Sequence, residues 1–251
     1  MATAKDIRLA PIRAKDANRI IKKLHYSGKV APNSQLHIGV FLDDILEGAL
    51  QFGPSINKRG TIKLVAGTGW NEFIELNRLA FSDKLPRNSE SRALSIALKI
   101  IRKQYPHIKW VVSFADGTQC GDGAIYRASG FVLTAIKKNT TVLRSPDGRV
   151  VQSMAVYHQP GLDMSDAVKL PGFMLRYVYF LDKSAKANLA VPILPFSKID
   201  EMGASMYLGK SREKQAMDSF PESQRRGSTD LHAPNLEGSG ETFSPLIANV
   251  S

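Results

Sequence analysis

The segment from Phe73 to Pro106, FIELNRLAFSDKLPRNSESRALSIALKIIRKQYP, contains the strand-to-helix transition that decides the fold. Residues 73–81 alternate apolar and polar side chains, which predicts a half-buried strand. Asn88 can then cap a helix that reaches Gln104, because apolar residues recur there at helical spacing and basic residues occupy the last turn. Pro106 prevents the helix from continuing. A strand, a short loop and a long helix in succession predict an α/β domain.

The flanking segments extend this pattern towards both ends. A helix is expected over 14–25, and a hairpin of two strands follows over 35–42 and 45–53. After the central helix, a buried strand at 110–114 leads through a loop into a short helix at 124–129. The remaining strands, which should complete the same sheet, are expected over 131–136, 140–144, 150–158 and 173–180.

These elements predict one domain with helices on the faces of a sheet, over residues 1–183. Beyond Ser184 the periodicity fades. Residues 184–251 are predicted to be an extension in which the apolar segment 191–200 docks on the domain. The polar, Ser/Gly-rich residues 210–251 are predicted to be a flexible tail.

The composition excludes several classes of protein. With 43% hydrophobic and 23% charged residues over 251 positions, the usage is that of a globular protein rather than a disordered or fibrous one. No stretch approaches the roughly 20 apolar residues of a membrane span, and Cys120, the single cysteine, cannot form an internal disulfide. The first residues do not resemble a secretory signal, so a soluble intracellular protein is expected. Glycine-rich dinucleotide loops, CxxC and HExxH are absent.

The net charge of +11 is unevenly distributed. Residues 1–183 contain 27 of the 34 Lys and Arg residues and 15 of the 23 Asp and Glu residues, so this part carries +12. The excess positive charge therefore belongs to the predicted domain and not to the tail. It favours a polyanionic partner, although a role in solubility alone is the alternative.

Two loop segments carry residues suited to catalysis. His25 and Tyr26 follow the first helix, where they can supply an acid or base, a phenol or metal ligands, or can simply cap and pack. Asp116 lies where the strand at 110–114 opens into a loop, a position at which open α/β sheets gather ligands. The Asp-Gly pairs of this loop are equally typical of turns. Cys120 is a candidate nucleophile there, but a lone cysteine is more often inert.

Two further segments are candidates for ligand contacts. The loop 82–91 precedes a helix N-terminus, whose free amides favour a phosphate or another anion, and Arg87 adds positive charge. Tyr126 lies on a short helix that ends at Gly130 and should point back towards the loop that carries Asp116. Core packing alone would explain Tyr126 equally well.

Several runs resemble the GNAT acyltransferase fold and, more specifically, the Mom family of DNA-modification proteins of Mu-type bacteriophages. The runs YRASGF at 126–131 and the strand–loop–helix at 73–104 carry the first resemblance. The second spans essentially 5–183 and is carried by residues 25–29, 74–78, 85–92, 113–116, 119–123 and 125–131. The resemblance implies a GNAT-like α/β fold with a mixed, mostly antiparallel sheet flanked by helices.

The resemblance also implies an activity. A protein of this family would add a carbamoylmethyl, glycinamide-like group to the exocyclic amine of adenine in viral DNA, in the cytoplasm of the infected bacterium, and so shield that DNA from host restriction. The implied active site is His25, Tyr26, Asp116 and Tyr126, and an iron-binding role is implied for the same four residues. Double-stranded DNA is the implied partner, and a homodimer is one assembly to consider.

The group donor is left open by one departure from the GNAT pattern. The pyrophosphate loop of that fold carries glycines, whereas residues 86–91 contain none. The candidates for cofactor binding at this position are Arg87, Asn88, Ser89 and Ser91. Acetyl-CoA and glycyl-tRNA are therefore both considered as donors, and the second would make tRNA a partner.

The proposed target allows further expectations. An adenine flipped out of the duplex needs an aromatic pocket, for which Tyr26, Tyr126, Phe114 and Trp70 are candidates. Contacts with DNA phosphates are expected from Lys15, Arg19, Lys22, Lys23, Lys29, Lys58, Arg59, Lys63, Lys137 and Lys138. Two other hypotheses come from different functional classes: an N-acetyltransferase that acts on a small amine or a protein, and a DNA-binding module without catalysis.

Overall fold

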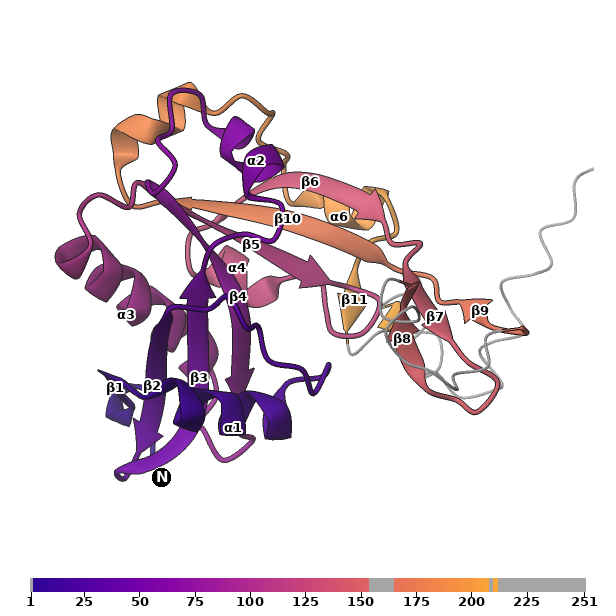
Figure 1. Cartoon of the computed structure of the whole chain (residues 1–251), viewed down its shortest axis with the longest axis horizontal. Coiled ribbons are helices and arrows are strands. Elements are labelled where there is room, and N and C mark those ends of the chain that lie inside the picture. Colours follow the sequence, from indigo (N-terminus) through magenta and orange to yellow (C-terminus); the bar gives the residue numbers. More distant parts are fainter. Residues whose placement is uncertain (1, 154–164, 208–209, 212–251) are drawn as a thin grey trace, which may run out of the picture.

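The computed structural model describes residues 2–153, 165–207 and 210–211. Its main sheet has seven strands in the order β1-β2-β3-β4-β5-β10-β6 (Figure 1). Neighbouring strands are antiparallel except for β4 and β5, which run parallel. The prediction of a mixed, mostly antiparallel sheet is thus confirmed. The strands are β1 (Arg8–Pro11), β2 (Leu36–Leu42), β3 (Ile45–Gly53), β4 (Phe73–Phe81), β5 (Trp110–Asp116), β6 (Val132–Lys138) and β10 (Phe173–Phe180).

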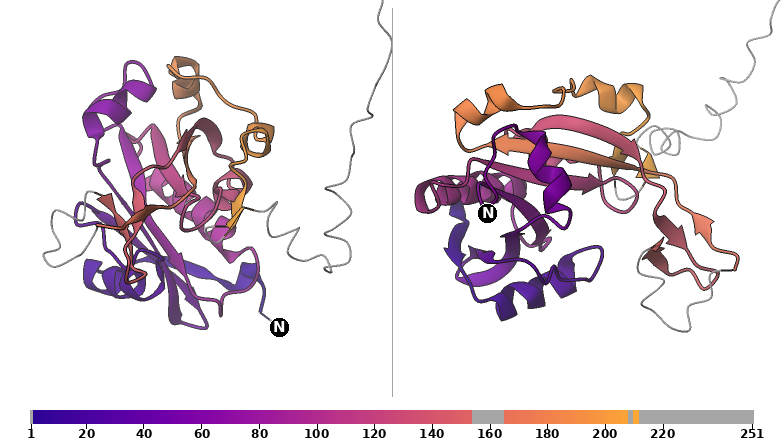
Figure 2. Two further views of the ribbon diagram at one scale, coloured as in Figure 1. Left: turned by 90° about the vertical axis from the view of Figure 1, so that its right-hand side faces the viewer. Right: turned by 45° about the horizontal axis from the view of Figure 1, so that its top comes forward.

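Helices cover both faces of this sheet (Figures 1 and 2). The α1 face is covered by α1 (Ala14–Leu24), α2 (Lys58–Thr61) and the 3-10 helices η2 (Ile62–Leu64) and η3 (Lys183–Asn188). The opposite, α3 face is covered by α3 (Ser89–Gln104), α4 (Ala124–Ala128) and α6 (Ser197–Glu201). The main core lies on the α3 face, where the apolar stripe of α3, including Leu94, Leu98 and Ile101, is fully buried.

The pairing between β4 and β5 is short, and this positions the functional site. Only residues 73–75 of β4 pair with residues 110–112 of β5, although both strands continue beyond this point. Residues 76–79 and 113–116 are therefore not bonded to each other and can line a cavity between the two strands.

Strands β7 (Val142–Arg144), β8 (Val150–Gln152) and β9 (Val168–Lys169) form a separate three-stranded sheet that projects from the domain (Figure 1). The prediction that the strands at 140–144 and 150–158 complete the main sheet is wrong for their described residues. Instead, β7 pairs with β8 and β9, while β6 pairs with β10 on one edge and its Leu133 forms an isolated bridge with Leu194 on the other. Residues 154–158 lie outside the described residues.

Asn88 is the N-cap residue of the central helix, as predicted, but its side chain does not contribute to the cap. Asn88 has a left-handed backbone with φ of 69° and makes no capping hydrogen bond, and α3 begins at Ser89. The short elements η1 (Ala4–Asp6), β1 and α2 were not expected from the sequence. They have three or four residues each, too few to show a period.

Residues 183–207, here called the strap, cross the molecule from one face to the other. Leu189 pairs with Val65 on the α1 face, Leu194 pairs with Leu133 at the edge, and Tyr207 pairs with Gly121 near α4. Ile199 is buried in the main core. The strap ends in β11 (Met206–Tyr207), which pairs with β12 (Lys210–Ser211). The rest of the predicted flexible tail, 212–251, lies outside the described residues.

No helix in the described part of the chain is both long and apolar enough to cross a membrane.

Candidate active site

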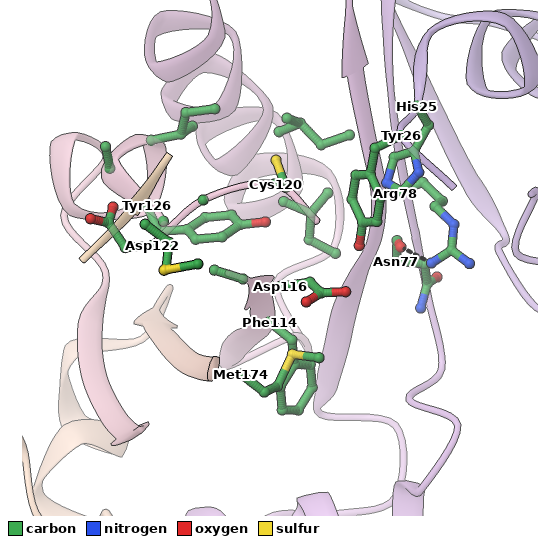
Figure 3. Close-up of a pocket in the computed structure, with 18 of the residues that line it drawn as sticks. His25, Tyr26, Asn77, Arg78, Phe114, Asp116, Cys120, Asp122, Tyr126 and Met174 are labelled. Atoms are coloured by element: carbon green, nitrogen blue, oxygen red, sulfur yellow. Dashed lines mark hydrogen bonds between the residues drawn. The ribbon is translucent and has the colours of Figure 1, made fainter. Parts of the chain in front are cut away.

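A cavity of about 350 Å³, here called the splay pocket, opens between the separated ends of β4 and β5 (Figure 3). All four residues of the predicted active site, His25, Tyr26, Asp116 and Tyr126, line it. They come from the end of α1, the end of β5 and α4, so the fold unites positions about 100 residues apart in the sequence. Figure 3 shows the hydroxyls of both tyrosines directed into the pocket.

His25 is neutral in this setting. Desolvation, together with the nearby charge of Arg78, lowers the pKa of His25 to about 4. The backbone N–H of Ser27 donates to Nδ1 at 3.2 Å, and the Ser27 hydroxyl lies 2.8 Å from the same atom. Because Nδ1 accepts, the ring proton resides on Nε2. His25 can therefore donate a hydrogen bond from Nε2, but its Nδ1 is already engaged and does not serve as a base.

The two tyrosines retain their protons at neutral pH. The Tyr26 ring packs 4.3 Å from that of His25, and desolvation and the charge of Asp116 raise the pKa of its hydroxyl. Burial raises the pKa of Tyr126 to about 12, and its ring packs 5.2 Å from that of Tyr177. Both phenols are hydrogen-bond donors suited to an oxyanion or a leaving group.

Asp116 is 3% exposed, and both of its oxygens accept hydrogen bonds. Oδ1 accepts from the backbone N–H of Thr118 at 3.0 Å and from the Asn139 amide at 3.2 Å, and Oδ2 accepts from the Gln119 amide at 3.0 Å. The carboxylate thereby fastens the loop after β5 to the start of the projecting sheet. Its acceptor capacity is largely used within the protein.

The polar centre of β4 was missed by the sequence analysis. Glu75, Asn77 and Arg78 all line the splay pocket. Burial raises the pKa of Glu75, against the opposing effects of Ser55, Asn77 and Arg78. The sequence did contain a signal for this part of the site. Three polar residues close together in a central strand have little access to solvent, so they indicate a polar cavity.

Arg78 organises the loop that carries His25 and Tyr26. Its Nε donates to the carbonyl oxygen of Lys29 at 2.9 Å, and its Nη1 donates to the carbonyl oxygen of Asn77 at 2.6 Å. Two other loop residues also line the pocket: Cys120, and the buried Asp122, which is 3.0 Å from Arg127. Desolvation raises the pKa of the Cys120 thiol, which disfavours the nucleophilic thiolate.

The donor set does not fit the iron site that the resemblance implied. Nδ1 of its imidazole accepts a hydrogen bond from Ser27, and both oxygens of its carboxylate accept hydrogen bonds within the protein. Within residues 2–153, 165–207 and 210–211, no three His, Cys, Asp or Glu side chains gather closely enough to hold a metal ion.

The residues predicted to bind a cofactor lie at the start of α3 and do not line the splay pocket. Arg87 and Asn88 are exposed there, whereas Ser89 is fully buried. Ser91 donates its hydroxyl to the Asn88 carbonyl oxygen at 3.3 Å, and its own carbonyl oxygen accepts from Ser129 at 3.2 Å. Two of the four residues thus have structural roles, and cofactor binding at this helix start stays a prediction.

The predicted DNA-binding residues lie mostly on the α1 face. The outer side of α1 forms a groove of about 760 Å³ lined by Lys15, Arg19, Lys22 and Lys23, together with Asp16 and Asn18. Arg59 and Lys63 are exposed on α2 and η2, and Lys29 is exposed after α1. Lys137 and Lys138 are exposed at the end of β6.

The aromatic candidates separate into two groups. Tyr26, Phe114 and Tyr126 line the splay pocket. Trp70 does not line it and instead packs 4.5 Å from the Lys58 ammonium, so its expected role in the base pocket is not supported. This cation–π contact also occupies one of the predicted phosphate-binding lysines.

Comparison with known proteins gives one family match. The model of the Mom protein family matches residues 6–198. A curated relative, methylcarbamoylase mom of Escherichia phage Mu, is 45% identical over 129 residues, which are 51% of this chain and 53% of that protein. The matched stretch therefore spans about half the length of this relative.

Solved structures of acetyltransferases are among the chains similar to this one. A Bacillus subtilis acetyltransferase in complex with CoA has a TM-score of 0.41 at 10% identity, over 69% of this chain and 97% of its own. A spermidine/spermine N-acetyltransferase from Vibrio cholerae has a TM-score of 0.43 at 11% identity, over 74% of this chain and 99% of its own.

Proposed function

Since this chain belongs to the Mom protein family, we propose that it is a transferase that adds a carbamoylmethyl group to the exocyclic amine of adenine in DNA. The observation that carries the proposal is the convergence of His25, Tyr26, Asp116 and Tyr126 on one pocket of a strongly basic domain. The phage Mu relative, named a methylcarbamoylase, supports this chemistry. The modification would protect phage DNA from restriction in the cytoplasm of the infected host.

The chemistry requires a base and an acid in the pocket. The exocyclic amine is a weak nucleophile and is paired in duplex DNA, so the adenine is flipped out to react. Its nitrogen attacks the acyl carbon of the donor: a C–N bond forms, the amine proton passes to a base, and the bond to the leaving oxygen or sulfur breaks. Glu75 is the buried carboxyl suited to accept that proton, and Tyr126 is the phenol suited to protonate the leaving group.

Atom balance favours one donor over the other. A glycyl group contains the same atoms as a carbamoylmethyl group, whereas an acetyl group lacks the nitrogen. We therefore favour glycyl-tRNA over acetyl-CoA. Acyl transfer gives the glycyl amide, and a redox-neutral rearrangement must follow: the bonds from the adenine nitrogen to the carbonyl carbon and from the glycyl amine to its CH2 carbon break, and bonds from the adenine nitrogen to the CH2 carbon and from the amine to the carbonyl carbon form. A reconstituted reaction tests this preference: RNase treatment should abolish the modification, and activity with acetyl-CoA after RNase treatment would overturn it.

Nucleoside mass spectrometry of DNA from expressing cells tests the function itself. The wild-type protein should produce deoxyadenosine with the added mass of a carbamoylmethyl group. Tyr126→Phe should abolish it while leaving DNA affinity nearly intact, and Tyr105→Phe, at an exposed position outside the pocket, is the matched control. Unmodified DNA from wild-type cells would favour a non-catalytic DNA-binding module. DNA-independent acetylation of amines would favour a conventional N-acetyltransferase.

A further inference from the structure

A second cavity, of about 460 Å³, lies on the α1 face and is here called the face cavity. Its walls come from the loop before α2 and α2 itself, including Ser55, Asn57 and Thr61, and from β10. It shares Glu75, Phe114 and Met174 with the splay pocket, so the two cavities meet at these three side chains. A volume between about 300 and 1,000 Å³ is typical of a small-molecule site.

The chemistry of the face cavity is that of a nucleotide site. Arg176 lines it, and the described residues offer its guanidinium hydrogen bonds only with Thr134, at 2.9 and 3.2 Å, and no carboxylate within ion-pair distance. A half-buried guanidinium without a carboxylate partner is suited to a phosphate. Phe114 is 38% exposed in the middle of the sheet, where its ring offers a stacking surface.

We propose that the face cavity binds the nucleotide that carries the target adenine, with the base against Phe114 and Met174 and a flanking phosphate on Arg176. This inference rests on the proposed function, because it divides the two substrates between two cavities. The exocyclic amine then lies beside Glu75, at the junction, and the acyl group approaches from the splay pocket, where Tyr126 lies.

The surroundings favour DNA over the donor as the occupant. The face cavity lies on the face that carries α1 and α2, with the exposed basic residues Lys22, Lys23 and Arg59. Phosphates on either side of a flipped nucleotide would run across this basic surface. The donor would then occupy the splay pocket, which extends towards α4 and the end of the strap.

The test is a double-mutant cycle between the protein and the DNA. One change removes the positive charge of Arg176, and the other removes the negative charge of one phosphate. The substrates are single-stranded oligonucleotides with one adenine among thymines, either unmodified or with a neutral methylphosphonate beside the adenine. Arg176→Gln and the neutral linkage should each weaken DNA binding and raise the KM for DNA about tenfold. Together they should do little more than either alone, because both remove the same contact. Arg102→Gln, another arginine with hydrogen bonds to β10 and the residue after it, is the matched control and should leave both values unchanged.

Phe114→Leu provides a second measurement that keeps an apolar side chain at the junction of the two cavities. Because it removes the stacking surface for the base, it should raise the KM for DNA more than the KM for the donor. Independent, additive effects of Arg176→Gln and the methylphosphonate would overturn the inference, as would a raised KM for tRNA instead of DNA. Coupled binding effects in a protein that modifies no DNA would instead overturn the proposed function and leave the nucleotide cavity standing.

Discussion

At the residue scale, two carboxyl groups line the splay pocket in different surroundings. Asp116 accepts hydrogen bonds from Thr118, Gln119 and Asn139. Burial, in contrast, raises the pKa of Glu75 above its ordinary value of 4.5. A base works best when its pKa approaches the working pH, and the pKa of Glu75 is raised although Ser55 and Asn77 hydrogen-bond to its carboxyl. We therefore propose that Glu75 transfers the proton and that Asp116 positions the loop.

Glu75→Gln should therefore lower kcat by about 100-fold, the usual contribution of a general base. The wild-type rate should rise with pH through the raised pKa of Glu75, since only the deprotonated carboxyl accepts a proton. The variant should lack this rise. Steady-state rates between pH 5 and 8 measure both effects, and Glu72→Gln, at an exposed ion pair with Lys109, is the control. An unchanged pH profile in Glu75→Gln would assign the base elsewhere.

His25 predicts a pH dependence of stability. Its folded pKa of about 4 lies below its ordinary value of 6.5, so the unfolded chain binds the proton more tightly. Stability that is present above pH 6.5 should fall as the pH is lowered towards 4. His25→Gln should flatten this decline in thermal unfolding curves. His107→Gln, at an exposed position, should leave the decline unchanged, and an equal decline in His25→Gln would contradict the assignment.

Single residues were predicted where their neighbours in the sequence reveal their setting. His25, Tyr26, Asp116 and Tyr126 stand beside strand and helix ends, where pockets form, and all four line the splay pocket. Glu75 and Arg176 were missed because each lies within a strand, where alternation is satisfied by either solvent or a cavity. Only the packing of α1 and α2 on the sheet decides whether such a side chain faces solvent or a cavity.

At the element scale, the turn into α4 connects backbone conformation to the pocket. Gly123 has φ of +84°, and a Cβ there would lie 2.5 Å from the Tyr177 ring and 2.9 Å from that of Tyr126. Gly148 has φ of +85° with nothing within 4 Å of such a Cβ. The two glycines share the backbone requirement but differ in their contacts.

Gly148→Ala should cost about 1–2 kcal/mol, the strain of a left-handed alanine. Gly123→Ala should lose more stability, because it adds a clash to the same strain, and it should lower kcat by displacing Tyr126. Chemical denaturation and turnover measure the two effects. Equal losses of stability, with activity intact in both variants, would show that Tyr126 is not held by this turn.

The bounds of the longer elements were predicted within a few residues, because their apolar side chains repeat often enough to define a period. The sequence did not predict which strands pair with each other. The strands at 140–144 and 150–158 alternate like sheet strands, but β6 pairs with β10 on one edge and contacts the strap on the other. Asn88 was expected as a cap from its residue type, whereas the chain enters α3 through a left-handed residue.

At the scale of the whole molecule, exposed lysines lie on both faces of the sheet. Lys22 and Lys23 are exposed on α1, and Lys99 and Lys103 are exposed on α3 on the opposite side. Lys22→Glu/Lys23→Glu should weaken DNA binding and reduce the slope of log affinity against log salt by about 0.9 for each lost phosphate contact on a duplex. Lys99→Glu/Lys103→Glu carries the same charge change and should bind nearly as wild type. Equal losses in both variants would mean that net charge, and not the α1 face, governs binding.

The interior position of β10 has a consequence for biosynthesis. This strand lies between β5 and β6 although it is made after both, so a chain emerging from the ribosome cannot complete the sheet until Phe180 has appeared. Met206 and Tyr207, which line the pocket, follow later still. A nascent chain would therefore gain helix α1 well before its splay pocket, whose walls would be complete only after Tyr207 has been made.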